Sequence, residues 1–133
     1  DIFKVESPVD ESEINRANYS KNLKIFRKLN TATNNKPWVM LSSGMSKQKF
    51  IDCLKLAYES GASGYLAGRS IWLSAFDQYP DLKRVEIDMK KSISFMKKLN
   101  SITKSKAKSI QNYLHQNFTI KNPETFSKLY KKF

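Results

Sequence analysis

Two short apolar segments, separated by a single amphipathic helix, constrain the fold of this chain more than any other feature. Residues 38–41 (Trp-Val-Met-Leu) and 64–67 (Gly-Tyr-Leu-Ala) are continuous apolar runs bounded by turn residues, which is typical of strands buried in a parallel sheet. Between them, a helix is predicted to begin at Ser46 and to stop at Gly61. Its buried face should comprise Phe50, Cys53, Leu54, Ala57 and Tyr58. Strand, helix and strand in this order predict a right-handed βαβ unit.

The same order extends in both directions. A strand is predicted over residues 2–7 and a helix over about 20–30, joined by a long polar segment, and another helix should open near Ser70 as its N-cap. An α/β chain with parallel strands leaves two architectures, the doubly wound open sheet and the closed barrel. Neither G-x-G-x-x-G nor a P-loop motif occurs, and composition alone does not separate the two.

Residues 81–133 are predicted to be a basic helical extension of the unit formed by residues 1–80. One helix should run from Asp81, and others should carry Ile102, Ile110, Tyr113 and Leu114 and span 122–133. The inward face of the first should hold Leu82, Val85, Met89, Ile93 and Met96.

The net charge of +12 resides mainly in this extension, with 13 basic and 4 acidic side chains after residue 80 against 11 and 8 before it. Lysines spaced between apolar residues indicate solvated helix faces, so we do not expect nucleic-acid binding, although affinity falling with salt would indicate it. No apolar run is long enough to span a membrane. The single cysteine, Cys53, and single histidine, His115, exclude an internal disulfide and a zinc cluster, and fit a reducing cytoplasm.

Lys4 is the residue with the most unusual expected position. Strand alternation places it with Ile2 and Glu6 on the face opposite Phe3 and Val5. If Phe3 and Val5 face the helices, Lys4 faces the interior of the fold. An amine withdrawn from water is more easily neutral, and a neutral amine can attack a carbonyl, while Glu6 could accept a hydrogen bond from it or move protons. A lysine at the edge of a strand, pointing to water, is the alternative.

The ends of the next two strands carry residues suited to an anion. Ser42, Ser43 and Gly44 follow one strand, and Gly68 and Arg69 follow the other. Small residues let backbone N–H groups approach phosphate oxygens, and the arginine fork matches them. The alternative is that both glycines only permit tight turns.

Three blocks, residues 1–8 (DIFKVESP), 37–44 (PWVMLSSG) and 61–72 (GASGYLAGRSIW), resemble the sixth, seventh and eighth strands of class I tagatose 1,6-bisphosphate aldolases and of the related sulfofructosephosphate aldolases. The resemblance is strong to about residue 80 and loose beyond. It implies the C-terminal part of a (β/α)₈ TIM barrel, followed by additional helices.

The resemblance further implies that Lys4 forms an imine with the ketose, that Ser42 contacts phosphate, and that Gly68 and Arg69 grip the phosphate. The implied reaction is reversible aldol cleavage of a ketose 1,6-bisphosphate to dihydroxyacetone phosphate and glyceraldehyde 3-phosphate, without metal or cofactor, since the protonated imine accepts the electrons.

The chain departs from the family in extent. The family's acid/base glutamate belongs to an upstream strand that these residues do not include, and Glu6 is a nearby candidate instead. Three βα units cannot close a barrel that typically needs about 250 residues. Together with the start at Asp1, this predicts a fragment, a split-protein piece completed by another chain, or a non-catalytic structural or regulatory remnant. We expect the chain alone to be inactive and the complete protein to be a homo-oligomer.

Overall fold

The strands form one parallel sheet. The computed structural model describes residues 2–113, in which β1 (Phe3–Val5), β2 (Trp38–Leu41) and β3 (Gly64–Leu66) lie in the order β1-β2-β3. The three predicted strands are confirmed, with β1 and β3 shorter than expected. The strand order therefore follows the order of the chain, without the reversal that marks a doubly wound sheet.

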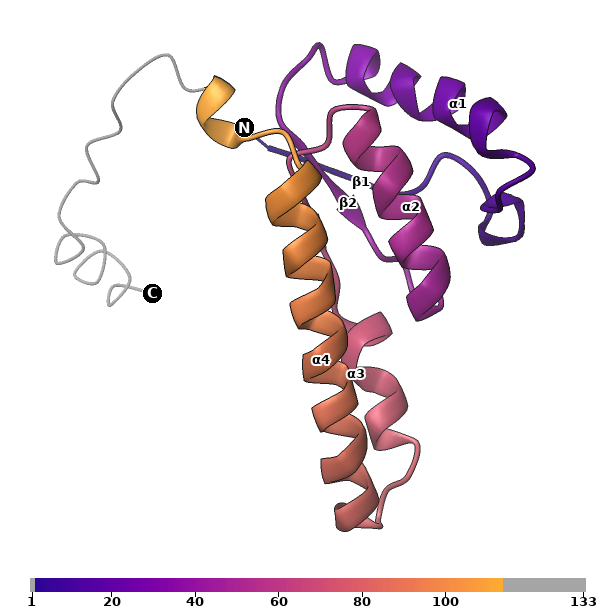
Figure 1. Cartoon of the computed structure of the whole chain (residues 1–133), viewed down its shortest axis with the longest axis vertical. Coiled ribbons are helices and arrows are strands. Elements are labelled where there is room, and N and C mark those ends of the chain that lie inside the picture. The colour runs from indigo at the N-terminus through magenta and orange to yellow at the C-terminus, as the bar shows by residue number, and fades with distance from the viewer. Residues whose placement is uncertain (1, 114–133) are drawn as a thin grey trace, which may run out of the picture.

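Helices connect and follow these strands (Figure 1). The α-helices are α1 (Tyr19–Ala32), α2 (Lys47–Glu59), α3 (Arg69–Phe76) and α4 (Leu82–Lys106), and two short 3₁₀ helices are η1 (Glu11–Glu13) and η2 (Ile110–Tyr113). The helices predicted over 20–30 and 46–61 are thus confirmed. Gly61 follows the C-cap of α2 with φ +101°, a left-handed conformation that favours glycine and ends the helix.

The helices cover only one face of the sheet. Trp38 and Met40 of β2 are fully buried on the helix side, whereas Val39 and Leu41 point to the other face and are only partly buried. Right-handed crossovers that advance in the same direction along a sheet place their helices on the same face. In the described residues the opposite face therefore carries no helical layer, unlike a doubly wound sheet, which is covered on both faces.

One hydrophobic core holds the strands and helices together. The helices pack in a row, α1 on α2, α2 on α4 and α4 on α3. The predicted stripe of α2, Cys53 included, is buried in this core. The fully buried large side chains come from α1, β2, α2, α4 and the loop before α1, and are Phe26, Trp38, Met40, Phe50, Leu54, Leu56, Leu99 and Ile14.

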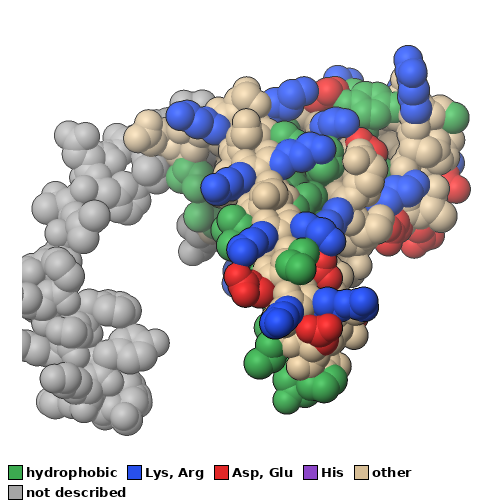
Figure 2. Space-filling view, turned by 60° about the horizontal axis from the view of Figure 1, so that its bottom comes forward, with side chains coloured by type: hydrophobic (Ala, Val, Ile, Leu, Met, Phe, Trp, Pro, Cys, Tyr) green, Lys and Arg blue, Asp and Glu red, His purple; other side chains and the backbone are tan. Residues whose placement is uncertain are grey.

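The helices α3 and α4 form a helical arm that extends away from the sheet (Figure 1). Only the second half of α4 reaches the core, through Phe95 and Leu99. Large apolar side chains remain exposed at the far end of the arm, namely Phe76, Tyr79, Leu82 and Ile87. Figure 2 shows hydrophobic side chains at this end, with basic and some acidic side chains spread over the rest of the face.

The predicted inward face of α4 is partly wrong. Leu82, Ile93 and Met96 are 70%, 44% and 40% exposed, and the helix instead buries Ser92, Phe95 and Leu99. Two apolar stripes with helical spacing occur on α4, and its neighbour α2 selects the stripe that contains Phe95. The spacing of apolar residues in a helix does not say which stripe meets a partner.

The boundary predicted after α4 also differs. Ile102 belongs to α4, which continues to Lys106, and only the short η2 follows. Leu114, His115 and the helix predicted over 122–133 lie outside the described residues. Across residues 2–113, none of the helices combines the length and apolar character needed to cross a membrane. The same residues contain no cluster of three potential metal ligands.

The thiol of Cys53 should be unreactive until the chain unfolds. Burial raises the pKa of this thiol to about 12, against a smaller opposing effect of a hydrogen bond with Ser7, so little reactive thiolate forms. We expect iodoacetamide at mildly alkaline pH to label the folded chain about 100-fold or more slowly than the chain in guanidinium. Mass spectrometry reports this directly because there is one cysteine. Similar rates in both conditions would contradict the packing of α2.

Candidate active site

The carboxyl ends of all three strands lie at one edge of the sheet, because the strands are parallel. Glu6 follows β1, Ser42 to Gly44 follow β2, and Gly68 with Arg69 follow β3. These residues line one open hollow of about 490 Å³ at that edge. The structure therefore brings together six of the seven residues that the sequence indicates as candidate site residues.

Lys4, the seventh, lies on the helix-free face of the sheet. It pairs with Val39, which pairs with Gly64, so these positions form a row across that face. Glu6 projects from the same face about 7 Å further along the strand, towards the hollow. Lys4 does not line the hollow itself and is exposed, because no described residue covers this face.

The turn after β2 has an unusual backbone. Ser43 and Gly44 have φ angles of +45° and +83°, two consecutive residues in the left-handed region. Ser42 is buried, and its backbone forms two hydrogen bonds. Its N–H donates to the carbonyl of Leu66 in β3 at 3.0 Å, and its own carbonyl accepts from the N–H of Met45 at 2.8 Å. Ser42 is thus held rigidly against β3, while Ser43 and Gly44 are presented to solvent.

The turn after β3 starts α3 earlier than predicted. Gly68, not Ser70, is the N-cap, because the N–H of Ile71 already donates to the Gly68 carbonyl at 2.8 Å. Within the described residues, the Ser70 hydroxyl is buried and has no hydrogen-bond partner. Arg69, the first residue of α3, is exposed and forms no ion pair with any residue from 2 to 113, so its guanidinium can meet an anion.

Two further residues, Trp72 and Lys47, belong to this region but were not among the site residues predicted from the sequence. Trp72 lines the hollow with Arg69, three positions before it on the same side of α3. A methyl group on Gly68 would lie 3.9 Å from Trp72 Nε1, so the indole stands close to the turn. Lys47 lines an adjoining hollow of about 420 Å³ with Arg69 and Gly44, and Asp77 lines the same hollow with the opposite charge. Residues three positions apart share one side of a helix, so the spacing from Arg69 to Trp72 could have identified Trp72 as a site residue from the sequence.

A long-range contact joins the loop after β1 to the turn after β2. The Glu11 carboxylate accepts hydrogen bonds from the Ser46 N–H at 3.0 Å and from the Ser46 hydroxyl at 2.7 Å. Ser46 is the N-cap of α2, as predicted, but its own side chain does not cap the helix. Glu11 satisfies one of the free N–H groups at the start of α2 instead, and so fixes the loop after β1 beside the turn after β2.

Comparison with known proteins gives a consistent family. The profile of DeoC/LacD family aldolases matches residues 1–74. The chain is 32% identical over 124 aligned positions to the tagatose 1,6-diphosphate aldolase of Staphylococcus epidermidis, covering 84% of this chain and 38% of that protein. It is 33% and 34% identical to the proteins of the same name from Lactococcus lactis and Streptococcus pneumoniae, covering 59% of this chain and 27% of each relative. The chain thus spans well under half the length of these relatives.

Replacing Glu11 by Gln should destabilise the chain by about 1 kcal/mol near neutral pH, because the start of α2 loses a charged acceptor. Hydrogen bonds from the side chain and the backbone of Ser46 hold the pKa of Glu11 below its usual 4.5. A lowered folded-state pKa gives stability that is present above 4.5 and lost as the pH falls through the folded-state value. Urea unfolding should therefore show the difference near pH 7 and its progressive loss as the pH falls below 4.5.

The neighbouring Asp10 provides the matched control, because its side chain makes no hydrogen bond or ion pair within the described residues. Asp10→Asn should leave stability almost unchanged at both pH values. A Glu11→Gln effect that did not vary with pH would argue against the contact with Ser46.

Proposed function

The chain belongs to the DeoC/LacD family of aldolases, and on that premise we propose that it supplies the Schiff-base lysine and a phosphate site of a class I aldolase. The substrate we propose is a ketose 1,6-bisphosphate such as tagatose 1,6-bisphosphate. The observation that carries the proposal is the meeting of Glu6, Ser42–Gly44 and Gly68–Arg69 around one hollow, with Lys4 behind it on the same face of β1.

In the proposed reaction the Lys4 amine attacks the C2 ketone and loses water to form a protonated imine. The imine accepts the electron pair of the C3–C4 bond as that bond breaks, and the proton of the C4 hydroxyl leaves to a base. Glyceraldehyde 3-phosphate departs first. Protonation of the remaining enamine at C3 and hydrolysis of the imine then release dihydroxyacetone phosphate and restore the amine. Glu6 lies on the right face to carry protons in these steps.

The phosphate site we propose lies between the turns after β2 and β3. Arg69 is free to form paired hydrogen bonds with phosphate oxygens. The left-handed turn at Ser43 and Gly44 has an exposed backbone that can approach an anion, and the first turn of α3 presents N–H groups to the same space.

This chemistry calls for a cover over the helix-free face, because removal from water favours the neutral form of an amine. We propose that further βα units, from the same polypeptide or another chain, close the sheet into a (β/α)₈ barrel and enclose Lys4. The greater length of the relatives supports this proposal. The exposed apolar end of the helical arm supports a homo-oligomer, and the free thiol of Cys53 suits a reducing cytoplasm.

A non-catalytic structural or regulatory module is the second candidate. The exposure of Lys4 in the described chain favours it, because an exposed lysine lacks the apolar surroundings that activate a catalytic amine. The two candidates differ in whether a carbonyl compound becomes covalently attached to Lys4.

Borohydride reduction in the presence of dihydroxyacetone phosphate should attach the ligand to Lys4 in the complete protein. Peptide mapping should find one labelled lysine, and Lys4→Met should lower turnover by on the order of 10³-fold or more, since the covalent step is lost. Lys24→Met, an exposed lysine on α1, is the matched control and should keep full activity. The 133-residue chain alone should show no turnover. Absence of label on Lys4 would favour the non-catalytic module.

Arg69→Gln should raise the dihydroxyacetone phosphate concentration needed for half-maximal trapping by roughly 10- to 100-fold, because a charged hydrogen-bond donor to phosphate is worth about 1.5–3 kcal/mol. The maximum labelling of Lys4 at saturation should not change. Arg27→Gln, an exposed arginine on α1, should shift neither quantity. An unchanged midpoint in Arg69→Gln would place the phosphate elsewhere.

A further inference from the structure

A second pocket lies in the helical layer, between the loop before α1 and the middle of α2. Its volume is about 230 Å³, and it is more enclosed than the hollow at the strand ends. Every residue that lines it belongs to that loop, to the first turn of α1 or to α2. All seven lining residues therefore belong to the described part of this chain, and none of them lies on the helix-free face of the sheet.

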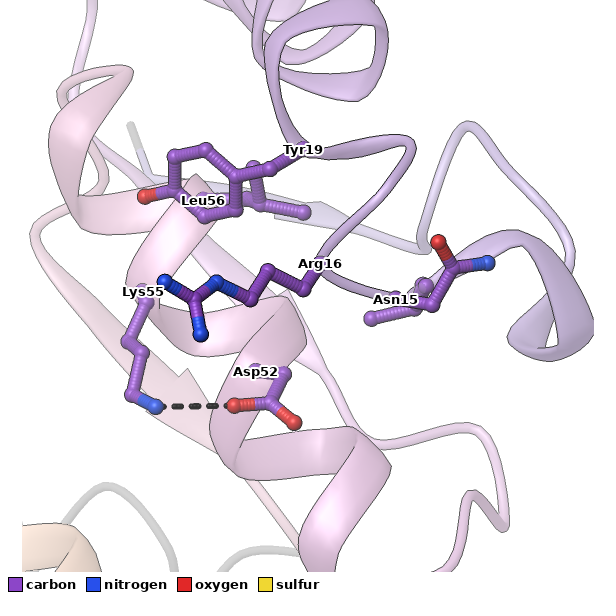
Figure 3. Close-up of a pocket in the computed structure, with 7 residues that line it drawn as sticks. Asn15, Arg16, Tyr19, Asp52, Lys55 and Leu56 are labelled. Carbon is purple, nitrogen blue, oxygen red and sulfur yellow. Dashed lines mark hydrogen bonds and ion pairs between the residues drawn. The ribbon is translucent and has the colours of Figure 1, made fainter.

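The floor and one wall of the pocket are apolar. Ile14 and Leu56 are 2% and 1% exposed, and the ring of Tyr19 stands beside Leu56 (Figure 3). The Tyr19 hydroxyl donates to Glu59 at 2.6 Å. Burial and this contact with Glu59 raise the pKa of Tyr19 to about 12, so the ring remains a neutral phenol near physiological pH. A compact apolar group would fit against these three side chains.

The acceptors in the pocket wall already have partners. The Asp52 carboxylate accepts from Lys55 at 2.8 Å and from Gln48 at 3.2 Å. Burial alone would raise the pKa of Asp52, but these hydrogen bonds outweigh it and lower the pKa, so the group stays ionised. The Ile14 carbonyl accepts from Lys49 at 2.7 Å. Each of these three acceptor oxygens is thus already engaged by a donor of the chain itself.

Hydrogen-bond donors of the pocket, in contrast, remain without partners within the described residues. Figure 3 shows the Arg16 guanidinium projecting into the space between the Tyr19 ring and Asp52, with Lys55 across from it. The Arg16 side chain forms no hydrogen bond and no ion pair within residues 2–113, so all five N–H donors of its guanidinium are available. Lys55 uses one donor on Asp52 and keeps the others. With Asp52 negative and Arg16 and Lys55 positive, the pocket carries a net charge of +1.

From this arrangement we infer that the pocket binds a small organic anion, whose carboxylate or phosphate meets Arg16 and Lys55 and whose apolar part lies on Tyr19 and Leu56. The planar guanidinium can donate two parallel hydrogen bonds to either group. The volume is below the usual range of about 300–1,000 Å³ for drug-sized ligands, which limits the ligand to a compact metabolite. The site is separate from the proposed phosphate site at Arg69, which lies at the strand ends.

Phenyl phosphate is a suitable probe, because it joins a phosphate to one aromatic ring. The titration uses the full 133-residue chain with Arg69→Gln, so that binding at the strand ends is suppressed, and is followed by ¹H–¹⁵N spectra. The backbone signals of Tyr19 and Lys55 should shift and saturate. Adding Arg16→Gln should raise the dissociation constant about tenfold or more, in line with loss of a charged donor.

Arg27→Gln in the same background is the matched control, because Arg27 is an exposed arginine of α1 that does not line the pocket. It should change the dissociation constant less than twofold. Benzoate in place of phenyl phosphate tells whether the site prefers a carboxylate. Shifts that do not saturate, an equal affinity after Arg16→Gln, or equal losses in both variants would overturn the assignment, the last by showing a diffuse attraction to basic charge.

Discussion

The parallel pairing of β1, β2 and β3 in chain order is the constraint on which the rest of the structure depends. It brings the carboxyl ends of the strands to one edge, and it places the connecting helices on one face. The first effect gathers the turns that contain Ser42 to Gly44 and Gly68 to Arg69. The second leaves the row of Lys4, Val39 and Gly64 uncovered. A candidate phosphate site and an exposed lysine thus share one topological cause.

Local patterns in the sequence predict much of this arrangement. The strand of Trp38 to Leu41 and the helix from Ser46 to Gly61 were both predictable, because apolar runs and terminal residues determine them within a short window. The residues at the carboxyl ends of the three strands were expected to lie together, because parallel strands end at the same edge of a sheet. These predictions required no knowledge of which distant residues touch.

The features that could not be predicted depend on distant partners. Glu11 and Ser46 are 35 positions apart, and no local pattern marks a carboxylate that caps another helix. On α4, the contact with α2 buries Phe95 and Leu99, whereas Ile93 and Met96 of the predicted stripe stay exposed. The start of α3 at Gly68 shows the same limit at smaller scale, since a serine suited to capping stands two positions too late. Within residues 2–113 no element covers the face of β1 that carries Lys4, so its exposure could not be read from the strand pattern alone.

The open sheet has a consequence for how a complete ring would assemble. In the described residues β1 and β3 each have one neighbour, so both outer edges present unpaired backbone groups. A polypeptide that closes the ring must pair with both of these edges, the one at β1 and the one at β3. If the closing strands belong to another chain, pairing at the first edge makes pairing at the second edge an intramolecular event with a local effective concentration, so two weak edges together can bind far more tightly than either alone. Closure should then be cooperative, with half-joined species scarce.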